Sequence, residues 1–201
     1  DVPIPAYPGD YTPPVEPPVD HQWGHPLSRL SRRLRETSHK SFAAYLQWLQ
    51  SASATDNEWQ EFVNCLTTNL TAFFREEHHF HALVDDLKAI AGKGAARPLR
   101  IWCSAASTGE EPYSIAMTVV ETLGSAAPVR IVASDIDTKV LATAQRGVYG
   151  SDARGLSPER LQRHFLRGKG TNAGFLRIKP ELAGLIDFRP FNLMSRSWGG
   201  Q

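Results

Sequence analysis

The residues best suited to bind a ligand or to take part in a reaction lie where short apolar runs end. The run Leu99–Cys103 is followed by a turn of small residues, Ser104–Glu111, which holds one glycine and closes on two glutamates. Small side chains let a ligand approach the backbone, and the start of the following helix offers unpaired amides. The glutamates would repel phosphate, and the phosphate-binding pattern GxxxxGK[ST] is absent from the sequence. The turn therefore favours a ligand with a cationic or hydroxyl-rich part.

Two further polar residues follow predicted strands. Asp135 ends the run Val129–Ser134, where an acid can accept hydrogen bonds from both hydroxyls of a ribose. Asn192 follows the run Leu185–Phe191 and could offer an amide edge to a purine. Together these residues favour a nucleoside without phosphate and with an ammonium group, such as S-adenosylmethionine. The alternative is an ordinary α/β turn whose two glutamates only complement the helix N-terminus.

Hydrophobic periodicity predicts the elements that position these residues. Residues 26–93 predict a small helical domain of four helices, because leucine and aromatic residues recur there at helical spacing. The predicted caps of the last three helices are Ser38 or Ser41, then Asp56, then Thr71. The first helix begins at Pro26 and carries Arg29, Arg32, Arg33 and Arg35.

Residues 94–201 predict an α/β domain. The order strand, helix, strand, helix is typical of a parallel sheet flanked by helices. Asp137 is the predicted cap of the second of these helices. Residues Ser157–Gly168 predict a further helix with a serine cap and a glycine stop, and Gly174–Pro180 alternates like a strand.

Composition excludes several classes of protein. The chain has 201 residues and a net charge of +1, which gives no sign of nucleic-acid binding. Its two cysteines, Cys65 and Cys103, are too few for a disulfide framework, and we expect reduced thiols. No apolar run approaches the ~20 residues of a membrane span. No basic and then apolar leader opens the sequence, so we expect a cytoplasmic protein without membrane insertion.

Residues 1–25 form a proline-rich segment of a different kind. Its first 20 residues hold seven prolines and four acids and no basic residue. Such a composition buries little surface, so we expect an extended or disordered tail. The alternative is a PxxP ligand from Pro14 to Pro17.

Four longer stretches carry a family resemblance. They are TTNLTAFFREEHHF (Thr67–Phe80), CSAASTGEEPYSIAM (Cys103–Met117), ASDIDTKVLATAQRGVY (Ala133–Tyr149) and LSPERLQRHFLRGKG (Leu156–Gly170). These stretches resemble the chemotaxis receptor methyltransferases, the CheR family of protein-glutamate O-methyltransferases. The resemblance implies an α/β methyltransferase fold with a parallel sheet, preceded by a small all-helical domain. It also implies a small antiparallel β insertion at residues 168–183.

The resemblance implies a site for S-adenosylmethionine and its product, S-adenosylhomocysteine. Arg75 would hold the methionine carboxylate, Glu111 would take the ammonium group, and Asp135 would bind the ribose hydroxyls. Each role agrees with the chemistry of the side chain, since a guanidinium suits a carboxylate and an acid suits a diol. Two residues of the helical domain and two beside the adenine complete the implied set, namely Asn69, Thr71, Asn192 and Leu193.

The implied reaction is methyl transfer to a glutamate side chain of a chemoreceptor. A free glutamate has a pKa of ~4.3 and is already ionised at neutral pH, so no strong base is required. Alignment and a cation that positions the substrate carboxylate would help. Arg167 is the candidate catalytic residue. The alternative is that Arg167 has no catalytic role and only stabilises the C-terminus of a helix through the helix dipole.

Two other ligand classes are disfavoured. The histidines His78, His79 and His81 suggest a metal, but the sequence lacks HExxH and a matching cysteine pair, so we expect none. The basic first helix suggests nucleic acid, but we find no aromatic–proline motif for a flipped base. The resemblance implies instead that this helix faces the acidic methylation region of a chemoreceptor's cytoplasmic domain.

The resemblance also implies a tether at residues 168–179. Gly168, Gly170 and Gly174 precede an alternating strand, and an exposed strand edge accepts a peptide as an added strand. The implied peptide is the C-terminal peptide of a receptor. The alternative is a flexible loop between helix and strand.

The end of the sequence departs from the family pattern. The family continues into a strand with an Arg-Asn-Val-like motif and a nearby tyrosine, whereas this sequence stops at Gln201 without them. We therefore expect a partial methyltransferase domain, a marginally stable chain and little or no transfer activity. An inactive truncated copy that binds receptors or S-adenosylhomocysteine is the alternative to an enzyme.

Overall fold

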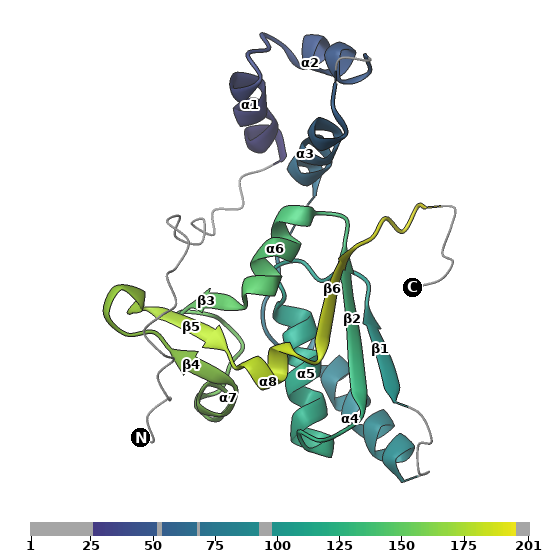
Figure 1. Cartoon of the computed structure of the whole chain (residues 1–201), viewed down its shortest axis with the longest axis vertical. Helices are drawn as coiled ribbons and strands as arrows, with labels where there is room; N and C mark the ends of the chain where they lie inside the picture. Colours follow the sequence, from purple (N-terminus) through teal and green to yellow (C-terminus); the bar gives the residue numbers. More distant parts are fainter. Residues whose placement is uncertain (1–25, 52–53, 68, 93–97, 196–201) are drawn as a thin grey trace.

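The computed structural model describes residues 26–51, 54–67, 69–92 and 98–195, which fall into three groups of elements (Figure 1). Three helices, α1 (Pro26–Glu36), α2 (Phe42–Leu49) and α3 (Asp56–Leu66), stand together at one end. A parallel sheet with its helices forms the middle, and a small antiparallel sheet lies beside it. The predicted fold class, a helical region followed by an α/β unit with an antiparallel insertion, is confirmed.

The parallel sheet holds three strands in the order β1 (Leu99–Cys103), β2 (Val129–Asp135) and β6 (Ile186–Pro190). Cys103 pairs with Ala133, and Asp135 pairs with Pro190. The carboxyl ends of the three strands therefore meet at one edge, which is where ligands bind in open α/β sheets.

Helices cover one face of this sheet. Helix α5 (Glu110–Leu123) packs on β2 and β6, and α4 (Glu77–Ala91) packs on α5 behind it (Figure 1). Helix α6 (Thr138–Arg146) contacts β2 and β6, and the short α8 (Pro180–Ala183) contacts α5. The core between sheet and helices is apolar and includes the buried side chains of Met117, Val119, Ile131, Tyr113 and Leu141.

Most predicted helix caps are present. Ser41 accepts from the Ala44 N–H at the start of α2, and Asp137 accepts from the first amides of α6. The cap of α3 is Thr55, one residue before the predicted Asp56, which is the first residue of the helix.

The antiparallel sheet has the strand order β3 (Val148–Gly150), β5 (Phe175–Ile178) and β4 (Phe165–Arg167). It therefore draws on residues well before 168. The predicted helix Ser157–Gly168 is too long, because α7 (Pro158–His164) ends at His164 and β4 follows. Phe165 is buried and pairs with Ile178, so strand pairing overrides the helical pattern. A 3-10 turn, η1 (Gly170–Asn172), joins β4 to β5.

Thr71 does not cap a helix, because α4 begins only at Glu77. Between them the backbone is irregular, with left-handed φ angles of 52° at Phe74 and 57° at Glu76. Phe74 is buried against Phe80, with ring centroids 5.0 Å apart. Burial of the aromatic side chains holds this segment out of the helix that its spacing predicted.

Phe73 anchors the same segment from the other side. Its ring meets those of Tyr149 and Phe165 edge-on, with centroids 4.9 and 5.7 Å apart. Gly155, with a φ of 88°, lies so close to the Phe73 carbonyl that a Cβ there would come within 1.9 Å of the oxygen. The segment 71–76 is therefore fixed by contacts with the region around the antiparallel sheet.

Candidate functional site

A cavity of about 520 Å³ opens at the carboxyl ends of β1 and β2. Its volume is typical of small-ligand sites. The segment between α3 and α4, the turn after β1 and the start of α5 surround it. Five of the seven residues implied as cofactor ligands line this cavity: Asn69, Thr71, Arg75, Glu111 and Asp135.

Asp135 sits at the end of β2 and is 9% exposed. Its Oδ2 accepts from the Ser107 N–H at 2.8 Å, and its Oδ1 accepts from the Asp137 N–H at 2.9 Å. A carboxylate offers about four lone pairs. Within the part of the chain that the structure describes, two of them are engaged, so Asp135 keeps capacity for two donors from the cavity.

The turn after β1 has the shape that small residues allow. Ser107 has a left-handed φ of 48°, which brings its N–H to Asp135. Gly109 has a φ of 101°, and a Cβ there would lie 2.7 Å from the Tyr149 hydroxyl oxygen and 2.9 Å from Ala144 Cβ. Glycine is required at this position both by its φ and by its neighbours.

The two glutamates of the turn have different surroundings. Glu110 is buried, and its Oε2 accepts from the Thr108 hydroxyl at 2.6 Å. Glu111 is exposed and lines the cavity. Burial raises the pKa of the nearby Cys103 thiol to about 12, and the negative charge of Glu111 adds to this. Cys103 is therefore a neutral thiol, and of the two glutamates of the turn Glu111 is the one that lines the cavity.

Arg75 extends from the irregular segment before α4. Its side chain is exposed, lines the cavity and donates to the Leu70 carbonyl oxygen at 2.9 Å. The Arg160 guanidinium lies 3.6 Å from the ring centroid of the adjacent Phe74 and also donates to Glu121 at 3.0 Å. The residue before Arg75 is thus held in place by Arg160, which packs on the Phe74 ring and pairs with Glu121.

Asn69 is buried, and its side chain is engaged within the protein. The Asn69 amide donates to Asp137 Oδ2 at 2.9 Å, and its backbone carbonyl accepts from the Ser107 hydroxyl at 3.2 Å. Thr71, half-buried, lines the cavity.

The remaining predicted site residues do not line the cavity. Asn192 follows β6, and its Oδ1 accepts from the Met194 N–H at 2.9 Å, while Leu193 is 48% exposed. The Phe191 N–H donates to the Asp135 carbonyl oxygen at 2.9 Å, so this turn begins beside the site. Arg167 is exposed at the end of β4, in a strand rather than at a helix C-terminus.

Part of the cavity was not predicted from the sequence. His79 lines it, although the histidine cluster had suggested only a metal. Among the described residues, no group of three His, Cys, Asp or Glu side chains is placed to hold a metal ion. The cavity also has an apolar wall, built by residues of α4, β1 and α5 that include Phe80, Leu83, Ile101 and Ile115. The helical or alternating spacing of these residues was the signal that the sequence offered for this wall.

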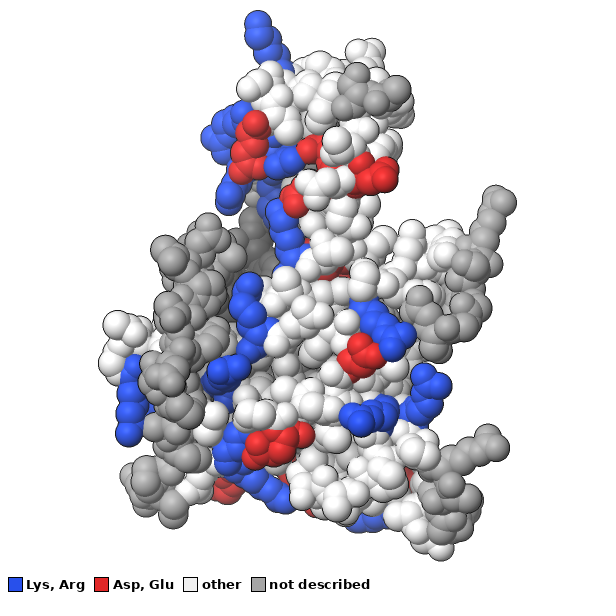
Figure 2. Space-filling view, in the orientation of Figure 1, with Lys and Arg blue, Asp and Glu red and all other residues white. Residues whose placement is uncertain are grey.

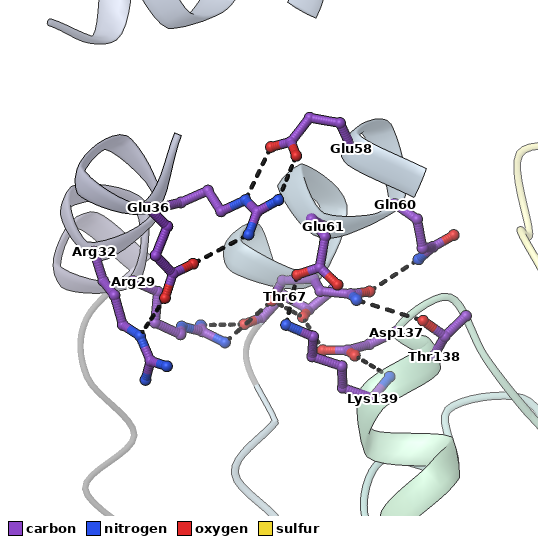
Figure 3. Close-up of polar contacts among 12 residues, drawn as sticks. Arg29, Arg32, Glu36, Glu58, Gln60, Glu61, Thr67, Asp137, Thr138 and Lys139 are labelled. Atoms are coloured by element: carbon purple, nitrogen blue, oxygen red, sulfur yellow. Dashed lines mark hydrogen bonds and ion pairs between the residues drawn. The ribbon is translucent and has the colours of Figure 1, made fainter. Parts of the chain in front are cut away.

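The arginines of α1 are partly used inside the protein. Arg29 donates to the Thr67 carbonyl oxygen (Figure 3). Arg33 donates to the Glu58 carboxylate, and the two contacts tie α1 to α3. Glu36 accepts from two of the arginines. In the space-filling view acidic groups lie among the basic ones over these helices (Figure 2). The basic face expected from the sequence is therefore interrupted.

Comparison with known families agrees with this geometry. Residues 69–200 match the family described as CheR methyltransferase, SAM binding domain, so the cofactor is S-adenosylmethionine. Residues 27–67 match the all-alpha domain of the same family. Fold and site thus define an S-adenosylmethionine-dependent methyltransferase domain. The chain belongs to the CheR methyltransferase family.

Individual proteins of known name support the same family assignment. The chain is 54% identical over 173 residues to chemotaxis protein methyltransferase 2 of Pseudomonas aeruginosa, covering 85% of this chain and 60% of that protein. It is 48% identical over 183 residues to the chemotaxis protein methyltransferase of Escherichia coli, covering 90% and 62%. The chain therefore spans about three fifths of the length of these relatives. Among its described residues, no helix is both long and apolar enough to cross a bilayer.

Proposed function

We propose that the protein transfers the methyl group of S-adenosylmethionine to glutamate side chains of chemoreceptors and so forms glutamate methyl esters. The observation that carries this proposal is the cavity beside Asp135. There an exposed cation, Arg75, and two acids, Glu111 and Asp135, surround one space within the region matched to the S-adenosylmethionine-binding domain.

The donor set fits the cofactor. Asp135 has two lone pairs available toward the cavity, and a ribose presents two vicinal hydroxyl donors. Arg75 can pair with the methionine carboxylate, since a guanidinium matches a carboxylate in charge and shape. Glu111 supplies the opposite charge for the ammonium group. Asn69 and Thr71 border the same space, and Asn192 and Leu193 are proposed to contact the adenine from the turn after β6.

The chemistry asks little of the protein beyond alignment. When bound, S-adenosylmethionine supplies a methyl group on a sulfonium, which passes to a carboxylate oxygen as the carbon–sulfur bond breaks. The substrate glutamate is ionised at neutral pH, so no residue of the chain needs to remove a proton. We propose that Arg167 on β4 contacts the substrate carboxylate and orients it for in-line attack.

The proposed partner is the cytoplasmic domain of a methyl-accepting chemoreceptor, so we expect the protein to act in the cytoplasm. The names of the relatives link them to chemotaxis. Arg32 and Arg35, exposed on α1, are proposed to face the acidic methylation region. A receptor C-terminal peptide is proposed to bind at residues 168–179. Because β5, the strand within this range, is the middle strand of its sheet, an added strand would pair with the neighbouring β3 or β4.

Two measurements on the 201-residue chain test the proposal. One is incorporation of radiolabelled methyl groups from S-adenosylmethionine into chemoreceptor membranes, and the other is S-adenosylhomocysteine binding by calorimetry. Incorporation that is base-labile, as methyl esters are, and that Arg75→Ala lowers when S-adenosylmethionine is limiting would support the enzyme.

Other outcomes are equally decisive. Binding of S-adenosylhomocysteine without incorporation would favour a binding module over an enzyme. Absence of both from a chain that melts cooperatively would contradict the proposed cofactor site.

A further inference from the structure

A second acid, Asp137, lies two residues after Asp135 and is 2% exposed. Its Oδ1 accepts from the backbone N–H groups of Lys139 at 2.9 Å and Val140 at 3.3 Å. Its Oδ2 accepts from the Thr67 hydroxyl at 2.7 Å and the Asn69 amide at 2.9 Å. Four donors fill the capacity of a carboxylate. Asp137 thus joins parts of the protein and has no lone pair left for a ligand.

The four donors come from separate segments. Lys139 and Val140 belong to the first turn of α6, so Oδ1 acts as an ordinary N-cap. Thr67 is the C-cap of α3, and Asn69 lies in the connection from α3 to the cavity. Figure 3 shows Thr67 and Asp137 in contact between α3 and α6. The donors on Oδ2 are not needed for capping, and they link the helical region to the end of β2.

The contacts of Asp137 continue into the cavity. Its N–H donates to Asp135 Oδ1, and the Ser107 N–H donates to Asp135 Oδ2. The Ser107 hydroxyl donates in turn to the Asn69 carbonyl oxygen at 3.2 Å. Asn69, Asp137, Asp135 and Ser107 therefore form a closed ring of hydrogen bonds. Three of its members, Asn69, Ser107 and Asp135, border the cavity, and Asp135 is the one that brings a carboxylate to it.

We propose that Asp137 is a positioning residue for cofactor binding. By holding Thr67 and Asn69 it fixes the ring that orients Asp135, so docking of the helical region and binding of the cofactor's ribose stabilise each other. Since coupling between two sites is reciprocal, docking strengthens cofactor binding by the same factor by which the bound cofactor strengthens docking. A change that disrupts the docking contact should therefore weaken cofactor binding. The inference rests on the proposed role of Asp135 as the ribose ligand.

Thr67 gives the cleanest test, because it lies outside the cavity lining. Its hydroxyl is also 3.0 Å from the Asn64 carbonyl oxygen, but the carboxylate is the nearer and charged acceptor. Thr67→Val keeps the shape and leaves one lone pair of Asp137 unpaired. It also removes the hydroxyl that accepts from the Asn69 amide at 3.3 Å, a second contact of the same link. We expect the Kd for S-adenosylhomocysteine, measured by calorimetry, to rise about threefold to tenfold. The matched control Thr67→Ser keeps the hydroxyl and should stay within about twofold.

A swap of the two facing groups provides the second test. Asn69→Asp places two carboxylates together and should raise the Kd about 30-fold, because a buried like-charge contact is unfavourable. Asp137→Asn retains a good N-cap side chain. In the double variant the donor and the acceptor exchange places, and the Kd should return to within about threefold of the wild-type value.

The controls separate this inference from the proposed function. If Asp135→Asn leaves the Kd unchanged, the ribose assignment fails whatever the other variants do. If Asp135→Asn weakens binding while Thr67→Val and Asn69→Asp lower only the melting temperature, Asp137 is a structural cap and the inference is overturned. If the Asn69 variants do not fold, the Thr67 pair still decides.

Discussion

The carboxyl ends of β2 and β6 lie side by side, yet they are built in opposite ways. At the end of β2, Asp135 and Asp137 are buried, and backbone amides hold both carboxylates in place. At the end of β6, Asn192 is exposed, and among the described residues its side chain bonds only within its own turn, to Met194. One end presents an oriented charge, and the other presents an amide on a turn at the surface.

This difference indicates which of the two strand ends should contribute more to the free energy of cofactor binding. An acceptor that the fold already orients loses little side-chain entropy when a ligand arrives. Asn192 would have to order itself, and its Oδ1 is already used by the Met194 N–H. We therefore expect the sugar and methionine parts of the cofactor to contribute more to affinity than the adenine part, which gives the following order of effects.

Asp135→Asn should have the largest effect. The variant replaces an acceptor-only side chain with one that turns an NH₂ group toward the N–H of Ser107 or Asp137. We expect the Kd for S-adenosylhomocysteine to rise about 10- to 100-fold, the scale of a hydrogen bond to a charged group. Calorimetry at constant salt measures it. A change below twofold would remove the β2 end from the site.

Arg75→Ala should follow, with a rise in Kd of about tenfold for loss of a paired charge. Arg75→Lys keeps the charge but not the planar fork, so it should fall between the wild type and the alanine variant. Because the side chain is exposed, added salt should shrink the difference. Equal affinities for all three proteins at low salt would show that the guanidinium does not meet the carboxylate.

Asn192→Ala should raise the Kd by no more than about threefold, since the side chain is exposed and an exposed hydrogen bond contributes little. Sinefungin or another analogue with an intact adenine is a suitable second ligand. An effect as large as that of Asp135→Asn would break the comparison between the two strand ends.

The smallest effect concerns Glu121, which accepts from Arg160, the residue that lies over the Phe74 ring beside Arg75. Burial alone raises the pKa of Glu121, but hydrogen bonds from His164 and Arg160 outweigh it and bring the value to about 2. Since the folded pKa lies below the unfolded one, this carboxylate stabilises the fold above about pH 4.5, and its contribution is lost as the pH falls toward about 2.

Glu121→Gln should therefore lower the melting temperature at pH 7 by about 2–4 °C, with the deficit vanishing toward acid pH. The exposed Glu181→Gln serves as the matched control in the same thermal melts. A deficit that is independent of pH would mean that the ion pair with His164 and Arg160 is not its source.

Local patterns predicted much of the fold. The strand Leu99–Cys103 has its predicted bounds, and Ser41 and Asp137 cap the helices that follow them. These features depend on spacing and on short side-chain contacts with the backbone, which a sequence displays directly. Asp135 was found by the same logic, because an acid after a buried strand must lie at the carboxyl edge of the sheet.

The errors have a common cause in contacts between distant segments. The helical spacing from Thr71 onward is real, but burial of Phe73 against Tyr149 outweighs it. That the arginines of α1 face a partner stays a prediction, but the pairing of Arg33 with Glu58, a buried acid that an apolar stripe cannot reveal, was not foreseen. Asp137 was predicted only as a cap, because its second oxygen meets residues about 70 positions away.

The packing of Phe73 has a consequence for the order of folding. Its partners Tyr149, Gly155 and Phe165 all come much later in the chain, so the segment that carries Arg75 cannot settle until they are synthesised. At ordinary translation rates Phe73 waits about 5–20 s for these partners. Helices α1–α3 can form early from local contacts, whereas the cavity is a late product of folding. The ligand-binding part of the nascent chain is thus the part most exposed to aggregation and to chaperone capture.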